Sequence, residues 1–204
     1  MRTPDLNWLK DSRIFQVNRL QAYSDHIYTI GKDKKPSSFS LNGTWKFNQS
    51  KNYDTSFKFF YNTEFNDTNW NDIQVPGHIQ LQGFDNPHYT DVTYPWDGHD
   101  VVKPGQIDMD KNKVYQYRKT FDLPQDFIGN KLILSFEGVE SNIYVWLNGK
   151  FIGYSEDSFT PSRFDITKYT QEKDNVLCVR IFQKCTGTWL EDQDMWRFSG
   201  IFRD

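Results

Sequence analysis

Segments in which apolar and polar residues alternate dominate the second half of the chain. In residues 114–123 one face of the alternation is apolar apart from Lys119, and the other face is polar or charged. The same spacing recurs in residues 131–138, where Leu132, Leu134 and Phe136 share a face. Side chains on a β-strand repeat every two residues, whereas those on a helix repeat every 3.6. Both segments are therefore predicted to be strands.

The clearest local signal is residues 142–155, in which two apolar runs flank Asn148 and Gly149. The Asn-Gly dipeptide supplies the positive φ angles of a type I′ turn, so a β-hairpin is predicted here. Residues 175–183 are apolar on both faces, which predicts a strand in the middle of a sheet. Residues 163–174, between these strands, hold at most one helical turn.

The first half of the chain is less regular. Residues 1–40 are predicted to be an irregular N-terminal segment, and the first strand signal is at residues 41–48. Residues 83–113 are rich in Gly, Pro and Asp and predict a long loop, and long ordered loops often carry function. Many short strands with scarcely any helix predict an all-β fold, an antiparallel β-sandwich over residues 41–204.

Composition narrows the classes of function. Phe, Trp and Tyr make up 17% of the chain. Aromatic rings pack well on pleated sheets, and they also stack on the apolar C–H faces of sugars. The net charge of −3 offers no basic surface for nucleic acid. No apolar run approaches the length of a membrane span, and the N-terminus lacks the apolar region of a signal peptide. With only two cysteines, a reduced, cytoplasmic protein is expected.

Most motifs that carry chemistry are missing from the sequence. The glycines follow neither the phosphate-loop nor the dinucleotide-binding spacing, and the histidines form no HExxH or other tight ligand pair. Cys178 lies within a predicted strand, where it is expected to be a small buried apolar side chain, and Cys185 has no neighbouring base in the sequence.

An acidic cluster stands out near the end of the chain. Glu191, Asp192 and Asp194 lie among aromatic residues in WLEDQDMWRFSGIFRD, residues 189–204. Glycoside cleavage uses two carboxylates on either side of the scissile bond, but sequence neighbours on a strand point to opposite faces. Solvated loop carboxylates and a hard-cation site are the alternatives, and the residue pattern alone leaves all three open.

The whole chain resembles the N-terminal region of the β-galactosidases of glycoside hydrolase family 2. The resemblance runs from about residue 7 to the end. It is carried by ordered stretches that include LNGTWKF, VPGHIQLQGFDNPHYTDVTYPW, FEGVESNIYVWLNGKFIGYSEDSFTPSRFDIT and WLEDQDMWRFSGIFRD. It implies that residues 41–204 form a jelly-roll sugar-binding domain. An immunoglobulin-like domain and a (β/α)₈ barrel with the catalytic glutamates would follow and are absent from this chain.

The resemblance also implies which residues contact the substrate. Asp194 occupies the position of an aspartate that contacts the galactosyl ring and ligates a sodium ion. Asp91 stands where the family commonly has a substrate-contacting asparagine, and an ionised Asp accepts hydrogen bonds but cannot donate them. Asp192 is expected to support the site from behind, Trp189 is a possible contact or support, and Trp196 is expected to be structural.

No catalytic residue and no cofactor is expected within the chain itself. Sodium and magnesium are expected in the full-length enzyme, the magnesium in the barrel. The expected partners are a β-galactoside such as lactose, the remaining domains or a second subunit, and further copies in a homo-oligomer. A free-standing carbohydrate-binding module and a purely structural scaffold remain as alternatives.

Overall fold

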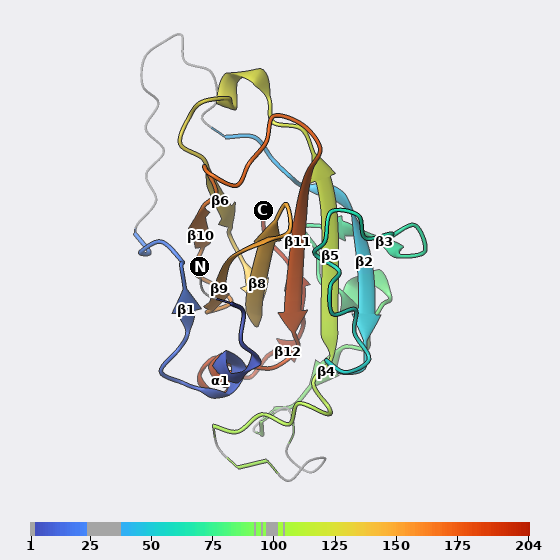
Figure 1. The fold of residues 1–204 in the computed structure, drawn as a ribbon. Helices are drawn as coiled ribbons and strands as arrows, with labels where there is room; N and C mark the ends of the chain where they lie inside the picture. The colour runs from blue at the N-terminus through green and yellow to red at the C-terminus, as the bar shows by residue number, and fades with distance from the viewer. Residues whose placement is uncertain (1–2, 24–37, 92, 95, 97–101, 104) are drawn as a thin grey trace.

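A computed structural model describes residues 3–23, 38–91, 93–94, 96, 102–103 and 105–204. Seven strands form one antiparallel sheet in the order β1-β9-β8-β11-β5-β2-β3 (Figure 1). In chain order the bounds are β1 Gln16–Val17, β2 Gly43–Ser50, β3 Asn71–Val75, β5 Val114–Phe121, β8 Asn142–Leu147, β9 Lys150–Glu156 and β11 Asn175–Phe182.

The central strand is β11, as its two apolar faces predict. All eight of its residues are buried, and it pairs with β5 on one side and with β8 on the other. A strand that buries both faces has to be covered on both sides of the sheet. Other described segments of the chain provide these two covers.

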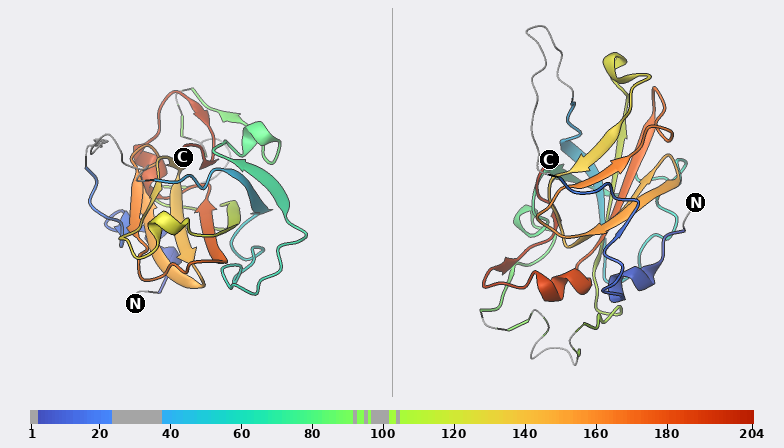
Figure 2. Two further views of the ribbon diagram at one scale, coloured as in Figure 1. Left: turned by 90° about the horizontal axis from the view of Figure 1, so that it is seen from above. Right: turned by 90° about the vertical axis from the view of Figure 1, so that its left-hand side faces the viewer.

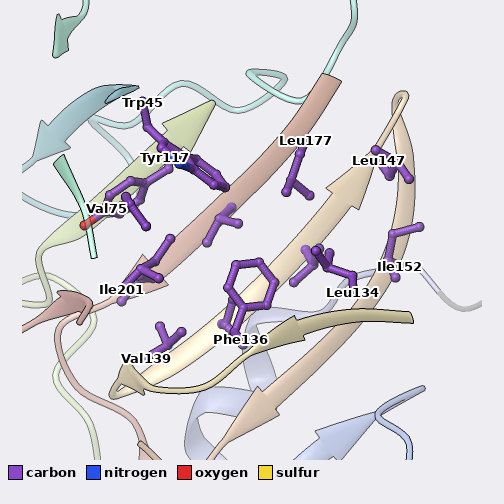
Figure 3. Packing of buried hydrophobic residues seen from close by; sticks show 14 of the residues in the cluster. Trp45, Val75, Tyr117, Leu134, Phe136, Val139, Leu147, Ile152, Leu177 and Ile201 are labelled. Carbon is purple, nitrogen blue, oxygen red and sulfur yellow. The ribbon is translucent and has the colours of Figure 1, made fainter. Parts of the chain in front are cut away.

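One cover is a second, smaller layer of short antiparallel pairs. β6 (Ile133–Phe136) pairs with β10 (Ser162–Asp165), and β7 (Val139–Glu140) pairs with β13 (Gly200–Ile201). Figure 3 shows the core between the layers, with side chains of β6, β7 and β13 facing those of the large sheet. The predicted fold class, an all-β antiparallel sandwich of jelly-roll type, is confirmed.

The other cover is built by aromatic residues from the N-terminal segment and from the stretch between β2 and β3. Trp8 stacks on Tyr144 of β8 with ring centroids 6.0 Å apart, and Phe60 packs edge-on against Trp146. Within residues 1–40, the described part contains the 3₁₀-helix η1 (Leu6–Lys10) and the edge strand β1. The described part of this segment therefore contributes to a second hydrophobic core, which lies on the face of the large sheet away from the sandwich core.

Helices in the part of the chain that the structure describes are short. Besides η1, they are η2 Gln80–Gln82, η3 Gln125–Phe127 and α1 Thr186–Leu190. No helix in the described ranges is long and apolar enough to span a membrane.

The predicted hairpin is confirmed at residues 148 and 149. Asn148 has φ 50° and Gly149 φ 76°, the two positive angles that a type I′ turn requires, and Leu147 lies opposite Lys150. The Asn148 side chain also accepts from the Val176 N–H at 2.8 Å and donates to the Tyr169 carbonyl at 2.9 Å. The turn is thereby tied to the central strand.

Replacing Gly149 by Val is expected to lower the free energy of unfolding by roughly 1 to 3 kcal/mol, because a β-branched residue resists positive φ. A Cβ at this position would meet only the Tyr61 carbonyl oxygen, 3.9 Å away, so the cost is conformational and not a clash. Chemical denaturation measures the change. Lys150→Val, which places the same side chain on the exposed first residue of β9, is the control. Equal stability of the two variants would contradict the assigned turn.

Candidate functional site at the β4–β12 end

Two segments far apart in the sequence meet at one end of the sandwich. β4 (His88–Tyr89) pairs with β12 (Trp196–Arg197), with Trp196 opposite Tyr89. Both strands lie at the end of the molecule that also carries α1 (Figures 1 and 2). The pairing joins the long loop of residues 83–113 to the acidic cluster.

Asp194 is exposed, and its Oδ1 accepts a hydrogen bond from the Tyr89 hydroxyl at 2.7 Å. This hydrogen bond is the main reason that the pKa of Tyr89 is raised, and the negative charges of Asp194 and Asp91 contribute further. Asp91 is exposed and lies two residues after Tyr89. The structure therefore gathers both predicted contact residues, Asp91 and Asp194, around one tyrosine.

An aromatic pair completes this edge. The rings of Tyr89 and Trp196 lie 5.4 Å apart, and the two residues are 47% and 54% exposed. Large aromatic rings are usually buried in a domain of this size. Exposed rings beside carboxylates can stack on the apolar face of a sugar while the carboxylates accept from its hydroxyls. The sequence analysis interprets Trp196 as structural, and that role does not predict an exposed ring. We call Tyr89, Asp91, Asp194 and Trp196 the acidic–aromatic edge.

Asp192 has a different environment from Asp194. It forms an ion pair with Arg197, whose guanidinium also reaches the Thr90 hydroxyl at 3.4 Å. Asp192 therefore acts on Arg197 of β12 and, through it, on the loop that carries Asp91. This geometry agrees with a supporting position behind the acidic–aromatic edge.

Glu191 turns inward. Its carboxylate accepts from the Ser158 N–H and from the Ser158 hydroxyl, both at 2.7 Å. Burial raises the pKa of Glu191, and the two hydrogen bonds from Ser158 oppose that shift. The three acidic residues of the cluster thus have three separate partners. In the part of the chain that the structure describes, no three His, Cys, Asp or Glu side chains form a group that could hold a metal ion.

Trp189 secures the long loop. Its ring packs on Trp96 and Tyr94 with centroid distances of 4.2 and 4.7 Å, and its Nε1 donates to the Gln106 carbonyl at 3.0 Å. These contacts anchor the described part of the loop against α1. Of the two roles considered for Trp189, the geometry favours support.

A small pocket of about 40 Å³ next to β12 is lined by an acidic residue that no sequence pattern singles out. Glu140, on β7, lines it together with Glu191 and Arg197. Burial raises the pKa of Glu140 to about 8; the charge of Glu191 adds to this shift, and the charge of Arg197 opposes it. A local sequence pattern could not identify Glu140, because its burial depends on the C-terminal segment folding over it.

The cysteines take no part in the site. Cys178 and Cys185 are free and buried. Burial raises the pKa of the Cys178 thiol to about 12 and that of Cys185 well above its usual value. Thiols that stay protonated are poor nucleophiles, so the interpretation of Cys178 as a buried apolar side chain agrees with the structure.

The chain is thus a β-sandwich domain that presents carboxylates beside exposed aromatic rings at one end. Residues 39–204 match the family model described as "Glycosyl hydrolases family 2, sugar binding domain". The chain belongs to this family.

Curated relatives agree with this assignment. A β-galactosidase of Halalkalibacterium halodurans is 53% identical over 206 residues, which cover 98% of this chain and 20% of the relative. A β-galactosidase large subunit of Leuconostoc lactis is 48% identical over 98% of this chain and 34% of the relative. The chain therefore spans a fifth to a third of these proteins.

Solved structures support the fold. A β-glucuronidase of Bacteroides uniformis superimposes with a TM-score of 0.59 at 20% identity, covering 81% of this chain and 17% of that one. A β-glycosidase of Bacteroides vulgatus gives a TM-score of 0.55 at 24% identity, with 80% and 19% covered.

Glu140 is expected to make stability depend on pH. Its folded-state pKa of about 8 exceeds the usual 4.5, so the folded protein retains a proton that the unfolded chain has released. This contribution to stability is complete below pH 4.5 and is lost as the pH rises to 8, at up to about 1.4 kcal/mol per pH unit. Glu140→Gln should therefore flatten the decline in the free energy of unfolding between pH 5 and pH 8.5.

Denaturation at both pH values, with Glu172→Gln as an exposed control, measures this effect. Parallel pH profiles for the wild type and Glu140→Gln would show that Glu140 ionises normally.

Proposed function

We propose that this chain forms part of the galactose-binding subsite of a β-galactosidase, with Asp194 and Asp91 contacting the sugar. The supporting observation is the β4–β12 pairing, which presents Asp194, Asp91 and two exposed rings on one edge. The two curated relatives reported above are both named as β-galactosidases, and this name indicates the substrate class. The catalytic glutamates would lie elsewhere in the longer polypeptide.

The chemistry of Asp194 suits a sugar hydroxyl. Tyr89 engages only Oδ1, and the side chain is exposed, so Oδ2 can accept from another donor. A hydrogen bond to a charged group contributes about 1.5 to 3 kcal/mol. Asp91 would act as a second hydrogen-bond acceptor. Because an ionised carboxylate only accepts, both residues would bind sugar hydroxyl groups that donate.

The arrangement of the acidic residues argues against hydrolysis by this chain alone. A glycosidase needs two carboxylates facing one bond, one as acid and one as base or nucleophile. Glu191 is taken up by Ser158, and Asp192 is paired with Arg197. Of the three carboxylates in the cluster, only Asp194 is exposed enough to meet a substrate.

A sodium ion fits Asp194 in part. A carboxylate oxygen is a hard ligand suited to such a cation, and Oδ2 is available. The remaining ligands would have to come from other domains, because the described residues contain no group of three such side chains. A bound sodium ion would supply a positive charge to which a sugar oxygen can coordinate. The magnesium expected in the enzyme would belong to the barrel.

Assembly with further domains or a second subunit follows from the same proposal, since one relative is named as a large subunit. A homo-oligomer and a cytoplasmic location are part of the proposal, and two unpaired cysteines are compatible with a reduced compartment.

A free-standing carbohydrate-binding module is the second candidate, because the exposed Tyr89–Trp196 pair could serve as a platform. Calorimetric titration of the chain with galactose and lactose distinguishes the two candidates. We expect no binding at millimolar sugar, because an edge with few converging contacts lacks the enclosure of a small-molecule site. Binding at millimolar concentration or tighter would favour the module.

Asp194→Ala is expected to lower kcat/KM for β-galactosides by about ten- to a hundredfold in the longer enzyme, at 1.4 kcal/mol per factor of ten. It should also weaken activation by sodium. The stability of the 204-residue chain should hardly change, because Asp194 is exposed and bonds only to Tyr89.

Steady-state kinetics at several sodium concentrations test this, with Asp72→Ala on β3 as the control for loss of an exposed charge. If the Asp194 variant keeps full activity and a full response to sodium, Asp194 is a solvated loop residue without a role in the site.

The 204-residue chain itself is expected not to hydrolyse a chromogenic β-galactoside, because Glu191 and Asp192 are bound to Ser158 and Arg197 and do not face one glycosidic bond together. The assay is run before and after repurification, alongside Glu191→Gln. Turnover that survives repurification and disappears in this variant would place the catalytic machinery in this chain.

A further inference from the structure

The last described residues extend a hydrogen-bonded ladder toward β6. β13 pairs with β7, with Gly200 opposite Glu140. Beyond this pair, the Phe202 and Arg203 N–H groups both donate to the Gly138 carbonyl, at 3.1 and 3.4 Å, so two residues oppose one and the register shifts by one residue. The Glu137 N–H then donates to the Asp204 carbonyl at 2.7 Å, which places Asp204 opposite Glu137. The chain at Asp204 therefore runs antiparallel to residues 137–140 and points along β6.

One edge of β6 has no strand beside it among the described residues, because β6 and β10 form a sheet of two strands. The Leu132 carbonyl accepts from the Ile166 N–H at 3.0 Å, so the main-chain groups of Leu132 and of every second residue after it face β10. The main-chain groups of Ile133 and Ser135 consequently face the other way. That side is the one on which the Glu137 N–H meets Asp204.

An apolar groove of about 660 Å³ lies beside this free edge, and Asp204 is one of its lining residues. Trp45, Val75 and Leu177 from the large sheet form part of its floor, and Leu134 and Phe136 of β6 form part of its wall. Figure 3 shows these five side chains directed into the space between the layers. Protein interiors contain few voids larger than a water molecule. A groove of this size next to the core is therefore expected to be filled by apolar side chains.

We infer that the free edge of β6 and this groove accept one further antiparallel β-strand, supplied in a longer polypeptide by the residues that directly follow Asp204. The ladder already has the direction and the register for such a strand. The curated relatives, of which the chain covers 20% and 34%, have ample additional length to supply it.

The register fixes the sequence pattern of this strand. Asp204 lies opposite Glu137, so the second and fourth positions after Asp204 face Ser135 and Ile133 and point outward as those residues do. The first and third positions lie opposite Phe136 and Leu134 and point into the groove, so they are apolar. A shift of one residue would turn the apolar side chains to solvent.

Two extensions of identical composition test the inference. Ile-Thr-Val-Thr-Val-Thr appended after Asp204 places its apolar residues at the first, third and fifth positions. Thr-Ile-Thr-Val-Thr-Val places them out of phase. We expect the in-phase extension to slow amide hydrogen exchange at Ile133 and Ser135 about tenfold or more and to raise Tm, whereas the out-of-phase extension does neither. Equal behaviour of the two extensions would overturn the inference.

Ile133→Pro provides a second measurement. Proline removes the Ile133 N–H from the free edge only and is tolerated on edge strands, so the β10 pairing should survive. In this background the in-phase extension should no longer protect Ser135. The alternative occupant of the groove is a second copy of the chain. Light scattering shows whether the unextended chain forms a dimer. If it does, and if amide exchange at Ile133 and Ser135 slows as the dimer forms, a second copy fills the groove and the inference is wrong. These readouts do not involve sugar, so they are independent of the role of Asp194.

Discussion

Burial of both faces of the central sheet is the constraint on which the rest of the structure depends. β11 exposes none of its eight residues, and its neighbour β5 carries Gln116 and Arg118 on the face away from the sandwich core. Covering these polar groups requires partners as well as packing. Arg118 donates to Asp67 at 2.7 Å, and Gln116 donates to the Phe57 carbonyl at 2.7 Å. The aromatic cover between β2 and β3 is thus fixed in place by hydrogen bonds.

With both faces covered, the ends of the sandwich are the places where side chains can remain available. The β4–β12 pair lies at one such end, and within it the acidic residues differ in their neighbours. Ser158 holds Glu191 inside, Arg197 holds Asp192 in an ion pair, and only Asp194 remains exposed. The division of roles comes from these partners, since the three carboxylates are chemically alike.

The sequence predicted the features that depend on neighbouring residues. The hairpin at Asn148 and Gly149 follows from turn chemistry, and β11 from an unbroken apolar run. The two-residue strands were not predictable, because β4 and β12 carry no pattern of their own and form through contacts more than a hundred residues apart. In the N-terminal segment, Trp8 likewise belongs to a core that only tertiary contacts assemble. The roles expected of Asp91 and Asp194 come from the family resemblance, whereas the hydrogen bond from Tyr89 to Asp194 is a tertiary contact that no local pattern predicts.

The exposure of Asp194 also gives a physical reason for the cation that the proposed function places beside it. In the present chain water solvates the carboxylate, so its charge costs little. If another domain covers this edge, the carboxylate loses that water, and an ionised group removed from water is costly unless hydrogen bonds and an opposite charge replace it. The Tyr89 hydroxyl supplies one such hydrogen bond in advance. A sugar hydroxyl and an alkali cation would supply the rest, so substrate, cation and domain contact would stabilise one another at this carboxylate.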